Sequence, residues 1–307
     1  MSKRFRFGVV GESVRTASEL TALALRAEEL GYATLTLRDH FVAEPFGDQL
    51  APMPALTAAA CATRTLRVGT LVLGNDYRHP VMLAKEAATL DHLSGGRFEL
   101  GIGAGWAREE YEAAGMPFEP AGVRVGRLEE ALQIVTSLLR GEATTFAGEH
   151  YQVGGLTVFP RPVQAPPPLL VGAGSPRMLR LAGRYADIAG VLPRALPGGT
   201  ISDEITERLP ETIARKVAHV REPGRDVELS MLVNPAFGPD PDDCAARIAR
   251  RRGWDADLVP DMPSQFVGPP EHIAGQMAER RDRYGFSYYL VSDRDLEAFA
   301  PVIGLLT

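Results

Sequence analysis

The chain has 307 residues, 45% of them hydrophobic and 23% charged, and a formal net charge of −6 at pH 7. A chain of this length can bury a full hydrophobic core without disulfides or metals. Because α/β barrels of comparable length form single domains, we expect one domain spanning residues 1–307. The excess of acidic residues gives no general attraction to nucleic acid or to an anionic membrane, so we expect a small-molecule partner.

The sequence also argues against several kinds of site. The two cysteines, Cys61 and Cys244, form no CxxC pair, so neither a disulfide framework nor a thiolate metal site is predicted. The six histidines include no HxH or HxxxH pair and no GxSxG motif occurs, so we expect no catalytic metal and no serine triad. No apolar run is long enough to cross a membrane and no signal-type segment is recognisable, so we expect a cytoplasmic protein.

Short apolar runs rich in β-branched residues alternate with helix-like segments along the chain. Arg6 to Val10 is predicted as the first strand, and Thr16 with Glu19 three residues later predicts a capping box for the helix that follows. The predicted strands cover residues 6–10, 33–37, 66–73, 97–102, 169–171, 187–192, 229–233 and 288–291. Strands that alternate in this way with helices predict an α/β fold, a single TIM-type (β/α)8 barrel.

Residues 142–167 interrupt the alternation between the fourth and fifth predicted strands. Two short β-like runs flank Ala147-Gly148-Glu149, which predicts a small hairpin, and the segment from Pro160 to Pro168 predicts a stiff extended connector. We therefore expect an insertion after strand 4. Residues 253–266 are predicted to be a second irregular stretch.

Ligands of parallel α/β proteins bind at the carboxyl ends of the strands. The residues of interest that follow predicted strands are Asp39-His40, Gly74-Asn75, Gly103-Ala104-Gly105-Trp106 and Gly172-Ala173-Gly174-Ser175. By this rule, they are expected to lie around one end of the barrel.

Asp39 and His40 could form a pair that handles protons, because an imidazole titrates near neutral pH and a carboxylate can orient it. The alternative is a histidine with a purely structural role near the end of a strand. The sequence alone leaves both interpretations open.

The turn from Gly172 to Ser175 has the properties of an anion site. Its small residues expose backbone N–H groups, and the start of the next helix adds partial positive charge. The alternative is a tight turn from strand to helix in which Ser175 is the N-cap and Pro176 the first helical residue. Phosphate binding is thus one of two interpretations of this turn.

Three stretches together carry a family resemblance. They are GTLVLGNDYRHPVMLAKEAATLDHLSGGRFELGIGAGW at 69–106, DHF at 39–41 and VGAGSPRMLRLAGRYAD at 171–187. Taken together and in chain order, they resemble the luciferase-like monooxygenase superfamily, and in particular its F420-dependent oxidoreductase branch. The resemblance covers almost the whole chain. It implies a TIM-type barrel with an insertion, FMN or the deazaflavin coenzyme F420 as cofactor, and a homodimer.

The resemblance also implies roles for the residues at the strand ends. It places the catalytic residues Asp39 and His40 beside the cofactor ring. It places Leu71 and Val72 at a strand bulge under the ring, where many relatives have a cis peptide bond without proline. The remaining residues implied to bind the cofactor are Gly74, Asn75, Gly103, Ala104, Gly105, Gly172, Ala173, Gly174 and Ser175, of which the last four would hold its phosphate.

The identity of the cofactor would decide the chemistry. With F420, the resemblance implies hydride transfer to or from a small organic substrate, with His40 exchanging a proton. With FMN, it implies a monooxygenase that receives reduced flavin from a partner reductase. Two further alternatives are a flavin-binding protein without turnover and an unrelated barrel of the aldolase or isomerase type.

One departure from the family bears on the substrate. The F420-dependent glucose-6-phosphate dehydrogenases, which this chain resembles around Asp39 and His40, carry an acidic residue after the GxG bend, and here that position is Trp106. We therefore expect glucose 6-phosphate not to be the substrate. Trp106 is predicted to line a pocket for a fairly apolar substrate, although a rim aromatic that only closes the barrel is the alternative.

Overall fold

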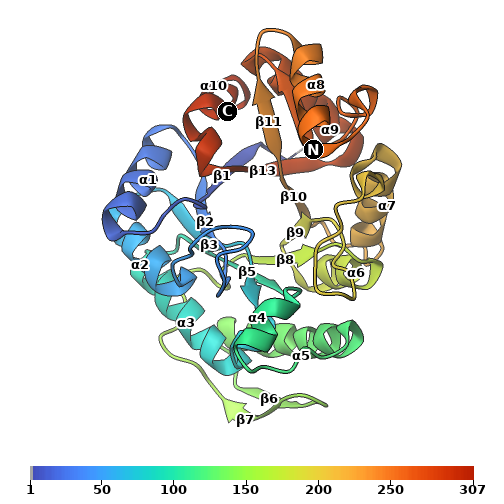
Figure 1. Ribbon diagram of the computed structural model, residues 1–307. Helices are drawn as coiled ribbons and strands as arrows, with labels where there is room; N and C mark the ends of the chain where they lie inside the picture. Colours follow the sequence, from blue (N-terminus) through green and yellow to red (C-terminus); the bar gives the residue numbers. More distant parts are fainter. Residues whose placement is uncertain (1–2) are drawn as a thin grey trace.

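The computed structural model describes residues 3–307 and shows a closed barrel of parallel strands surrounded by helices (Figure 1). The barrel strands are β1 (Arg6–Val10), β2 (Thr34–Leu37), β3 (Arg67–Thr70), β4 (Leu73–Gly74), β5 (Phe98–Gly103), β8 (Leu169–Ala173), β9 (Ile188–Val191), β10 (Glu228–Leu232) and β13 (Phe286–Ser292). Their order is β3-β2-β1-β13-β10-β9-β8-β5-β4, and pairing of β3 with β5 closes the ring. β3 and β4 lie at the position of the single strand predicted for residues 66–73, so the nine strands occupy eight positions around the ring. The predicted TIM-type (β/α)8 barrel is therefore confirmed.

Helices follow the strands and cover the outside of the barrel. They are α1 (Ala17–Glu29), α2 (Pro52–Ala62), α3 (Pro80–Leu93), α4 (Arg108–Ala113), α5 (Ala121–Leu139), α6 (Pro176–Tyr185), α7 (Pro210–Arg221), α8 (Pro241–Arg252), α9 (Pro270–Tyr284) and α10 (Leu296–Leu306). Most begin at a proline, which suits the first helical turn because its missing N–H would have no partner there. The predicted capping box is present, since Thr16 Oγ1 accepts the Glu19 N–H at 3.2 Å and Glu19 Oε2 accepts the Thr16 N–H at 2.9 Å.

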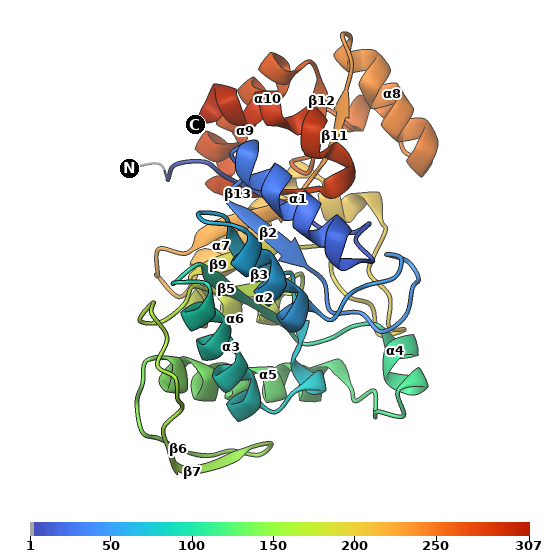
Figure 2. The ribbon, with the colours of Figure 1, turned by 90° about the vertical axis from the view of Figure 1, so that its left-hand side faces the viewer.

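The predicted insertion forms an antiparallel hairpin outside the barrel (Figures 1 and 2). Its strands are β6 (Thr144–Ala147) and β7 (Gln152–Leu156). Glu130 of α5 accepts the backbone N–H groups of Glu149, His150 and Tyr151 at 2.8 to 3.0 Å, which ties the hairpin turn to the barrel helices.

Two segments differ from the expectations. The segment after Trp106, for which the sequence predicts no helix, contains α4, whose six residues, four of them charged, give no helical pattern. The irregular stretch expected at 253–266 ends in β12 (Gln265–Gly268), which pairs in parallel with β11 (Asn234–Phe237) beside the barrel. Both strands have four residues, and β11 includes Pro235, so neither gives a clear strand signal.

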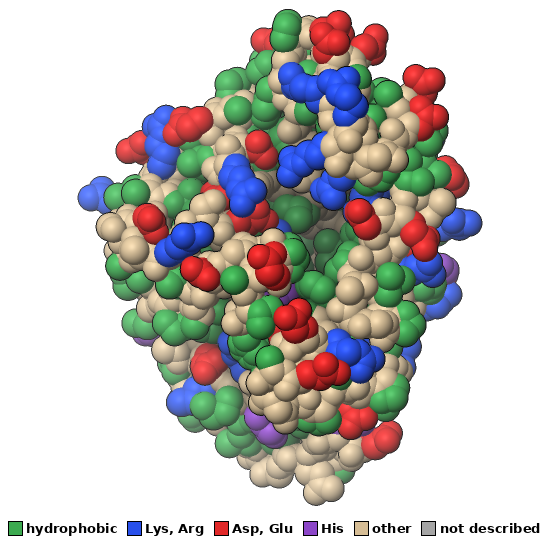
Figure 3. Space-filling view, viewed as in Figure 1, with side chains coloured by type: hydrophobic (Ala, Val, Ile, Leu, Met, Phe, Trp, Pro, Cys, Tyr) green, Lys and Arg blue, Asp and Glu red, His purple; other side chains and the backbone are tan. Residues whose placement is uncertain are grey.

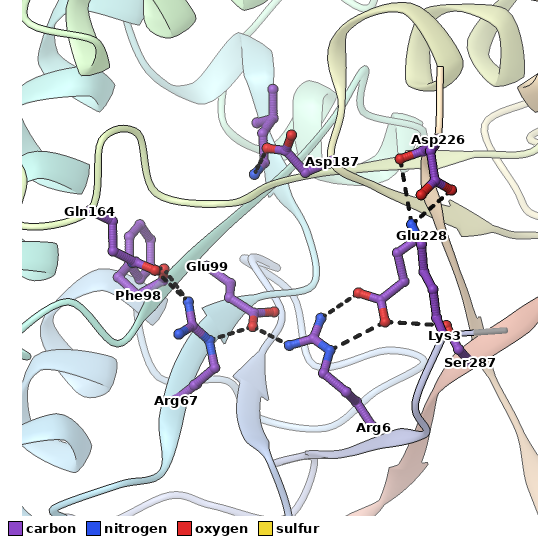
Figure 4. A network of polar contacts seen from close by, with 11 residues as sticks. Lys3, Arg6, Arg67, Phe98, Glu99, Gln164, Asp187, Asp226, Glu228 and Ser287 are labelled. Carbon is purple, nitrogen blue, oxygen red and sulfur yellow. Dashed lines mark hydrogen bonds and ion pairs between the residues drawn. The ribbon is translucent and has the colours of Figure 1, made fainter. Parts of the chain in front are cut away.

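Charged side chains fill one end of the barrel interior (Figure 4). Glu99 accepts hydrogen bonds from Arg6 and Arg67 at 2.6 Å each, and Glu228 accepts from Arg6 at 2.8 Å and from Ser287 Oγ at 3.2 Å. These residues lie at or near the starts of their strands, so the network marks the amino end of the barrel. Figure 2 shows the N-terminal segment at this end and α4 at the other.

An apolar layer lies above these charges and separates them from the carboxyl end. It contains Val10, Leu71, Leu170, Ile188, Tyr288 and Leu290. Ligand access along the barrel axis is therefore from the carboxyl end. Within residues 3–307, none of the helices has the length and apolar character needed to cross a bilayer.

Candidate active site

Four neighbouring strand positions carry the residues that the sequence singled out. β2, the β3–β4 position, β5 and β8 are adjacent in the barrel, and Gly74 pairs in register with Gly103. Figure 3 views the carboxyl end and shows a central hollow with hydrophobic side chains on its floor and charged side chains around it. Barrel closure thus brings these four segments to one mouth.

Val72 forms an apolar ridge at this mouth. The peptide bond between Leu71 and Val72 is cis, as the resemblance implied, and Val72 packs on the apolar layer that includes Leu71. A Cβ on Gly103 would lie 2.9 Å from Val72 Cγ2, and one on Gly172 would lie 3.3 Å from it. The two glycines therefore make room for Val72, and the three residues form an apolar surface at the mouth.

Two other predicted cofactor-binding glycines are needed by the packing of the chain itself. Gly105 has a φ of 75°, and a Cβ there would overlap the hydroxyl oxygen of Tyr111. A Cβ on Gly174 would overlap the carbonyl oxygen of Pro193. These contacts account for both glycines without a ligand, and their contact with a cofactor, like that of the half-buried Ala104, stays a prediction.

The turn after β8 has the capping arrangement that the sequence offered as one alternative. Ser175 is the N-cap of α6, its Oγ accepts the Met178 N–H at 3.5 Å, and Pro176 is the first helical residue. Ala173, the last residue of β8, is buried. The first N–H groups of α6 have no partner within the helix, so capping is compatible with an anion at the same place. Phosphate binding here stays a prediction.

His40 lies against a buried carboxylate that is distant in the sequence. Its Nδ1 is 3.1 Å from both Oε1 and Oε2 of Glu110, which α4 carries and which is 1% exposed. Burial alone would raise the pKa of Glu110, but the hydrogen bond and charge of His40 and the N–H groups of Phe41 and Val42 outweigh it, so that pKa is lowered. Glu110 is therefore a carboxylate that accepts from His40.

Asp39 has different partners from its neighbour His40. Arg78 donates to its carboxylate from Nη1 at 2.5 Å and from Nη2 at 3.1 Å, and the Gly74 N–H donates to it at 3.0 Å. The expectation that Asp39 orients His40 is thus corrected, because successive side chains of an extended segment point in opposite directions and Glu110 takes that role. A catalytic role of Asp39 stays a prediction.

Aromatic rings surround the imidazole of His40. The ring centroids of Phe46 and Trp106 lie 4.8 and 5.6 Å from that of His40, and the two rings are nearly perpendicular to each other. Arg38, which pairs with Glu12 at 2.5 Å, places its guanidinium 4.2 Å from the centre of the Phe46 ring. The predicted pocket residue Trp106 therefore lies beside the predicted catalytic histidine.

Asn75 lies behind the mouth rather than on its open surface. It is 2% exposed, and its Nδ2 is 3.4 Å from Asp76 Oδ1 and 3.5 Å from the hydroxyl of Tyr151 in the insertion. Asp76 in turn accepts from the Tyr111 hydroxyl at 3.1 Å. Asn75 is thus part of a buried polar layer that supports the segment after β4, and its contact with a cofactor stays a prediction.

The sequence analysis missed two residues of this site, Glu110 and Phe46. Glu110 is 70 residues from His40, and the exposed Glu109 beside it offers the same chemistry, so no local signal distinguishes the two. Phe46 lies in a Pro-rich loop without periodicity. Only its position shortly after Asp39-His40 could have suggested it.

The profile of the family described as "Luciferase-like monooxygenase" matches residues 4–297. The chain belongs to the luciferase-like monooxygenase family. The resemblance drawn from the three motifs is therefore confirmed.

Two curated relatives agree with this membership. An F420-dependent glucose-6-phosphate dehydrogenase of Microbacterium testaceum (strain StLB037) is 32% identical over 312 residues, which cover 99% of this chain and 90% of that protein. An F420-dependent glucose-6-phosphate dehydrogenase of Beutenbergia cavernae is also 32% identical, over a stretch that covers 90% of this chain and 80% of that protein.

Among solved structures, the F420-dependent tetrahydromethanopterin reductase from Methanopyrus kandleri has a TM-score of 0.77 at 19% identity, with 99% of this chain and all of that chain covered. An F420-dependent secondary alcohol dehydrogenase in complex with an F420-acetone adduct has a TM-score of 0.77 at 18% identity, with 99% and 98% covered. A monooxygenase from Streptomyces bottropensis has a TM-score of 0.73 at 22% identity, with 98% and 97% covered. At these identities, the structures support the fold alone.

Proposed function

We propose that this protein is an F420-dependent oxidoreductase that transfers a hydride between the deazaflavin and a small, fairly apolar organic substrate. The observation that carries this proposal is His40, held by the buried Glu110 and enclosed by Phe46 and Trp106 at the barrel mouth. The relatives at 32% identity, which are named as F420-dependent enzymes, support the choice of cofactor.

The planar ring and the phosphate of such a cofactor would lie at different places in the mouth. Its planar ring would lie on the ridge of Val72 between Gly103 and Gly172, and its phosphate at the turn that ends in Ser175. When bound, F420 would supply a carbon centre that accepts or donates a hydride. The protein would hold the ring, exclude water and exchange the proton that accompanies the hydride at His40.

The walls of the pocket favour an apolar substrate over a sugar phosphate. Phe46 and Trp106 present ring surfaces next to His40, and aromatic rings contribute large apolar contact areas. The oxidation of an alcohol to a carbonyl compound releases one hydride and one proton, which matches a hydride acceptor beside a histidine. We therefore propose an apolar alcohol and its carbonyl product as the substrate pair.

Titration of the purified protein with F420 and, separately, with FMN tests the cofactor. Fluorescence and thermal denaturation should show tighter binding of F420, and reduction of F420 by small secondary alcohols should exceed that by glucose 6-phosphate.

Replacement of Trp106 by Ala should raise KM for an apolar alcohol about tenfold. The same change at Trp254, which packs against Arg208 and Arg252, is the matched control.

A second titration tests the phosphate site. Replacement of Ser175 by Ala should weaken binding of F420 but not of the deazaflavin riboside that lacks the phosphate. Equal loss for both cofactors would indicate that Ser175 only caps α6.

The alternative is an FMN-dependent monooxygenase, and the matching family is described as a luciferase-like monooxygenase. Such an enzyme needs reduced flavin from a partner reductase. Preference for FMN together with oxygen consumption would replace the F420 proposal. Cofactor binding without turnover of any tested substrate, and without any effect of His40→Ala, would instead indicate a flavin-binding protein.

We also propose that the protein forms a homodimer through an apolar surface on α3 and the insertion. Met82, Leu93, Phe159 and Val163 are all more than half exposed, and Lys85 of α3 donates to the Phe159 carbonyl at 2.7 Å, which holds the two segments together. Light scattering should give twice the monomer mass, and Phe159→Glu should shift it toward the monomer. A monomer in the unmodified protein would exclude this proposal.

A further inference from the structure

We infer that Glu110 is a positioning residue that fixes His40 with its proton on Nδ1, so that Nε2 is the atom that exchanges a proton with the substrate. The assignment of Glu110 rests on the structure itself. The destination of the proton rests on the proposed function, and the experiment below separates the two.

Glu110 is surrounded by hydrogen-bond donors. Besides His40 Nδ1, the Phe41 N–H donates to Oε1 at 2.7 Å, the Val42 N–H at 3.4 Å, and the Tyr77 hydroxyl donates to Oε2 at 3.1 Å. Every one of these groups bonds to an ionised carboxylate, which only accepts. Since Glu110 has no proton to donate, Nδ1 of His40 must carry one.

The neighbouring charged groups leave Glu110 as the carboxylate that sets this tautomer. Asp39 is bonded to Arg78 and to the Gly74 N–H. Asp76, in the buried polar layer behind the mouth, accepts from Tyr111 and pairs with Arg127 at 2.9 Å. Among residues 3–307, no other carboxylate is hydrogen-bonded to His40. The burial of Glu110 makes its effect on the imidazole stronger than that of a solvent-exposed carboxylate.

The other ring nitrogen, Nε2, is not used by the contact with Glu110. Nδ1 faces Glu110, and the rings of Phe46 and Trp106 lie beside the imidazole. Within the described part of the chain, Nε2 has no hydrogen-bond partner, and the His40 side chain keeps 13% of its surface exposed. Nε2 therefore has a lone pair available to a substrate hydroxyl.

α4 is held in place by contacts that do not involve the substrate. Arg108 at its start donates to the carbonyl oxygens of Pro197 and Gly198 at 3.2 and 3.3 Å, across the mouth. Tyr111, beside Glu110, is fully buried and bonded to Asp76. The carboxylate is thus fixed by packing before any ligand arrives, which is the condition for a group that presets a histidine.

The resulting step balances in both directions. In oxidation, His40 Nε2 would accept the proton of the substrate O–H group as the C=O bond forms, and the bound deazaflavin would supply the acceptor for the hydride released when the C–H bond breaks. In reduction, the imidazolium would return this proton to the substrate oxygen while the reduced deazaflavin would supply the hydride to carbon. Glu110 keeps Nδ1–H bonded throughout and is not itself protonated.

The experiment compares Glu110→Gln with Glu109→Gln on the same helix. Glu109 is exposed and, within residues 3–307, forms no hydrogen bond or ion pair, so it is the matched control. Long-range ¹H–¹⁵N spectra of the ¹⁵N-histidine-labelled protein, with His40 assigned through His40→Gln, should show the Nδ1–H tautomer in the unmodified protein and in Glu109→Gln. Glu110→Gln should show a tautomer mixture and a kcat lowered about 10- to 100-fold at a KM within about twofold.

Glu110→Asp should recover part of kcat, because it keeps the charge at a greater distance. A His40 tautomer that is unchanged in folded Glu110→Gln would overturn the inference, whatever happens to kcat, and so would an unmodified protein with the proton on Nε2. If the tautomer responds as expected but no F420-linked turnover is found, the proposed function fails while the role of Glu110 stands.

Discussion

Arg78 donates two hydrogen bonds to the carboxylate of Asp39, from Nη1 at 2.5 Å and from Nη2 at 3.1 Å. The Asp39 side chain is only 4% exposed and that of Arg78 is 21% exposed. The same carboxylate accepts the N–H of Gly74, where β4 ends. This pair therefore joins the end of β2 to the segment that carries the Val72 ridge.

Replacement of Arg78 by Met should lower the free energy of unfolding by about 3 kcal/mol, because it leaves a buried carboxylate without its charged partner. Urea denaturation would measure this change, and cofactor titration should show weaker binding, since the Asp39 carboxylate that accepts the Gly74 N–H is no longer fixed by Arg78. Arg26→Met, which breaks the exposed pair with Glu297, is the control and should have little effect. Similar losses in the two variants would contradict the role given to Arg78.

The stability difference between the unmodified protein and Glu110→Gln should depend on pH. Burial raises the pKa of Glu110, but His40 and the N–H groups of Phe41 and Val42 have the larger combined effect and lower this pKa from its ordinary value of 4.5. A lowered folded-state pKa stabilises the fold above the unfolded-state pKa, and this stabilisation is lost as the pH falls through the folded-state value. The difference should thus shrink as the pH falls below about 4.5. Denaturation curves with a difference that grows in acid would exclude this linkage.

Gly105→Ala should destabilise the protein more than Gly115→Ala. Both glycines have positive φ, 75° and 70°, so both substitutions introduce backbone strain of about 1 kcal/mol. Only at Gly105 does the new Cβ overlap another group, the Tyr111 hydroxyl, whereas nothing lies within 4 Å at Gly115. The additional loss should be about 2 kcal/mol by thermal or urea denaturation. Equal losses would show that Tyr111 moves aside without cost.

Lys216→Met should loosen the segment at 193–209 that follows β9. Lys216 Nζ donates to the Leu192 carbonyl at 2.7 Å and to Glu207 Oε2 at 2.6 Å, and its burial lowers the pKa of the ammonium group. Its removal deprives the buried carboxylate of Glu207 and the partly buried carbonyl of Leu192 of a partner, which should cost about 2 to 3 kcal/mol. Limited proteolysis should then cleave this segment faster, while the exposed neighbour Arg215→Met should leave the rate unchanged. An unaltered cleavage rate in Lys216→Met would argue against this anchoring.

Much of the fold could be predicted because its signals are local. A buried parallel strand shows itself as a short apolar run, such as residues 97–102 before the Gly103 bend, and a helix start shows itself through Thr16 and Glu19 or through a first-turn proline. These signals depend on neighbours within a few residues. Elements without such signals are not predicted. Examples are α4, which has six residues of which four are charged, and the four-residue strands β11 and β12, because segments this short show no clear period.

The sequence by itself determined that the chain alternates strands and helices, carries an insertion at 142–167 and places His40, Trp106 and the Gly172–Ser175 turn at strand ends. Only the tertiary structure decided which carboxylate meets His40, that Asp39 pairs with Arg78, and that Gly105 and Gly174 serve the packing of Tyr111 and Pro193. The physical reason is that strand and helix patterns arise from the period of the backbone, whereas these contacts join residues up to 70 positions apart and exist only once the barrel has closed.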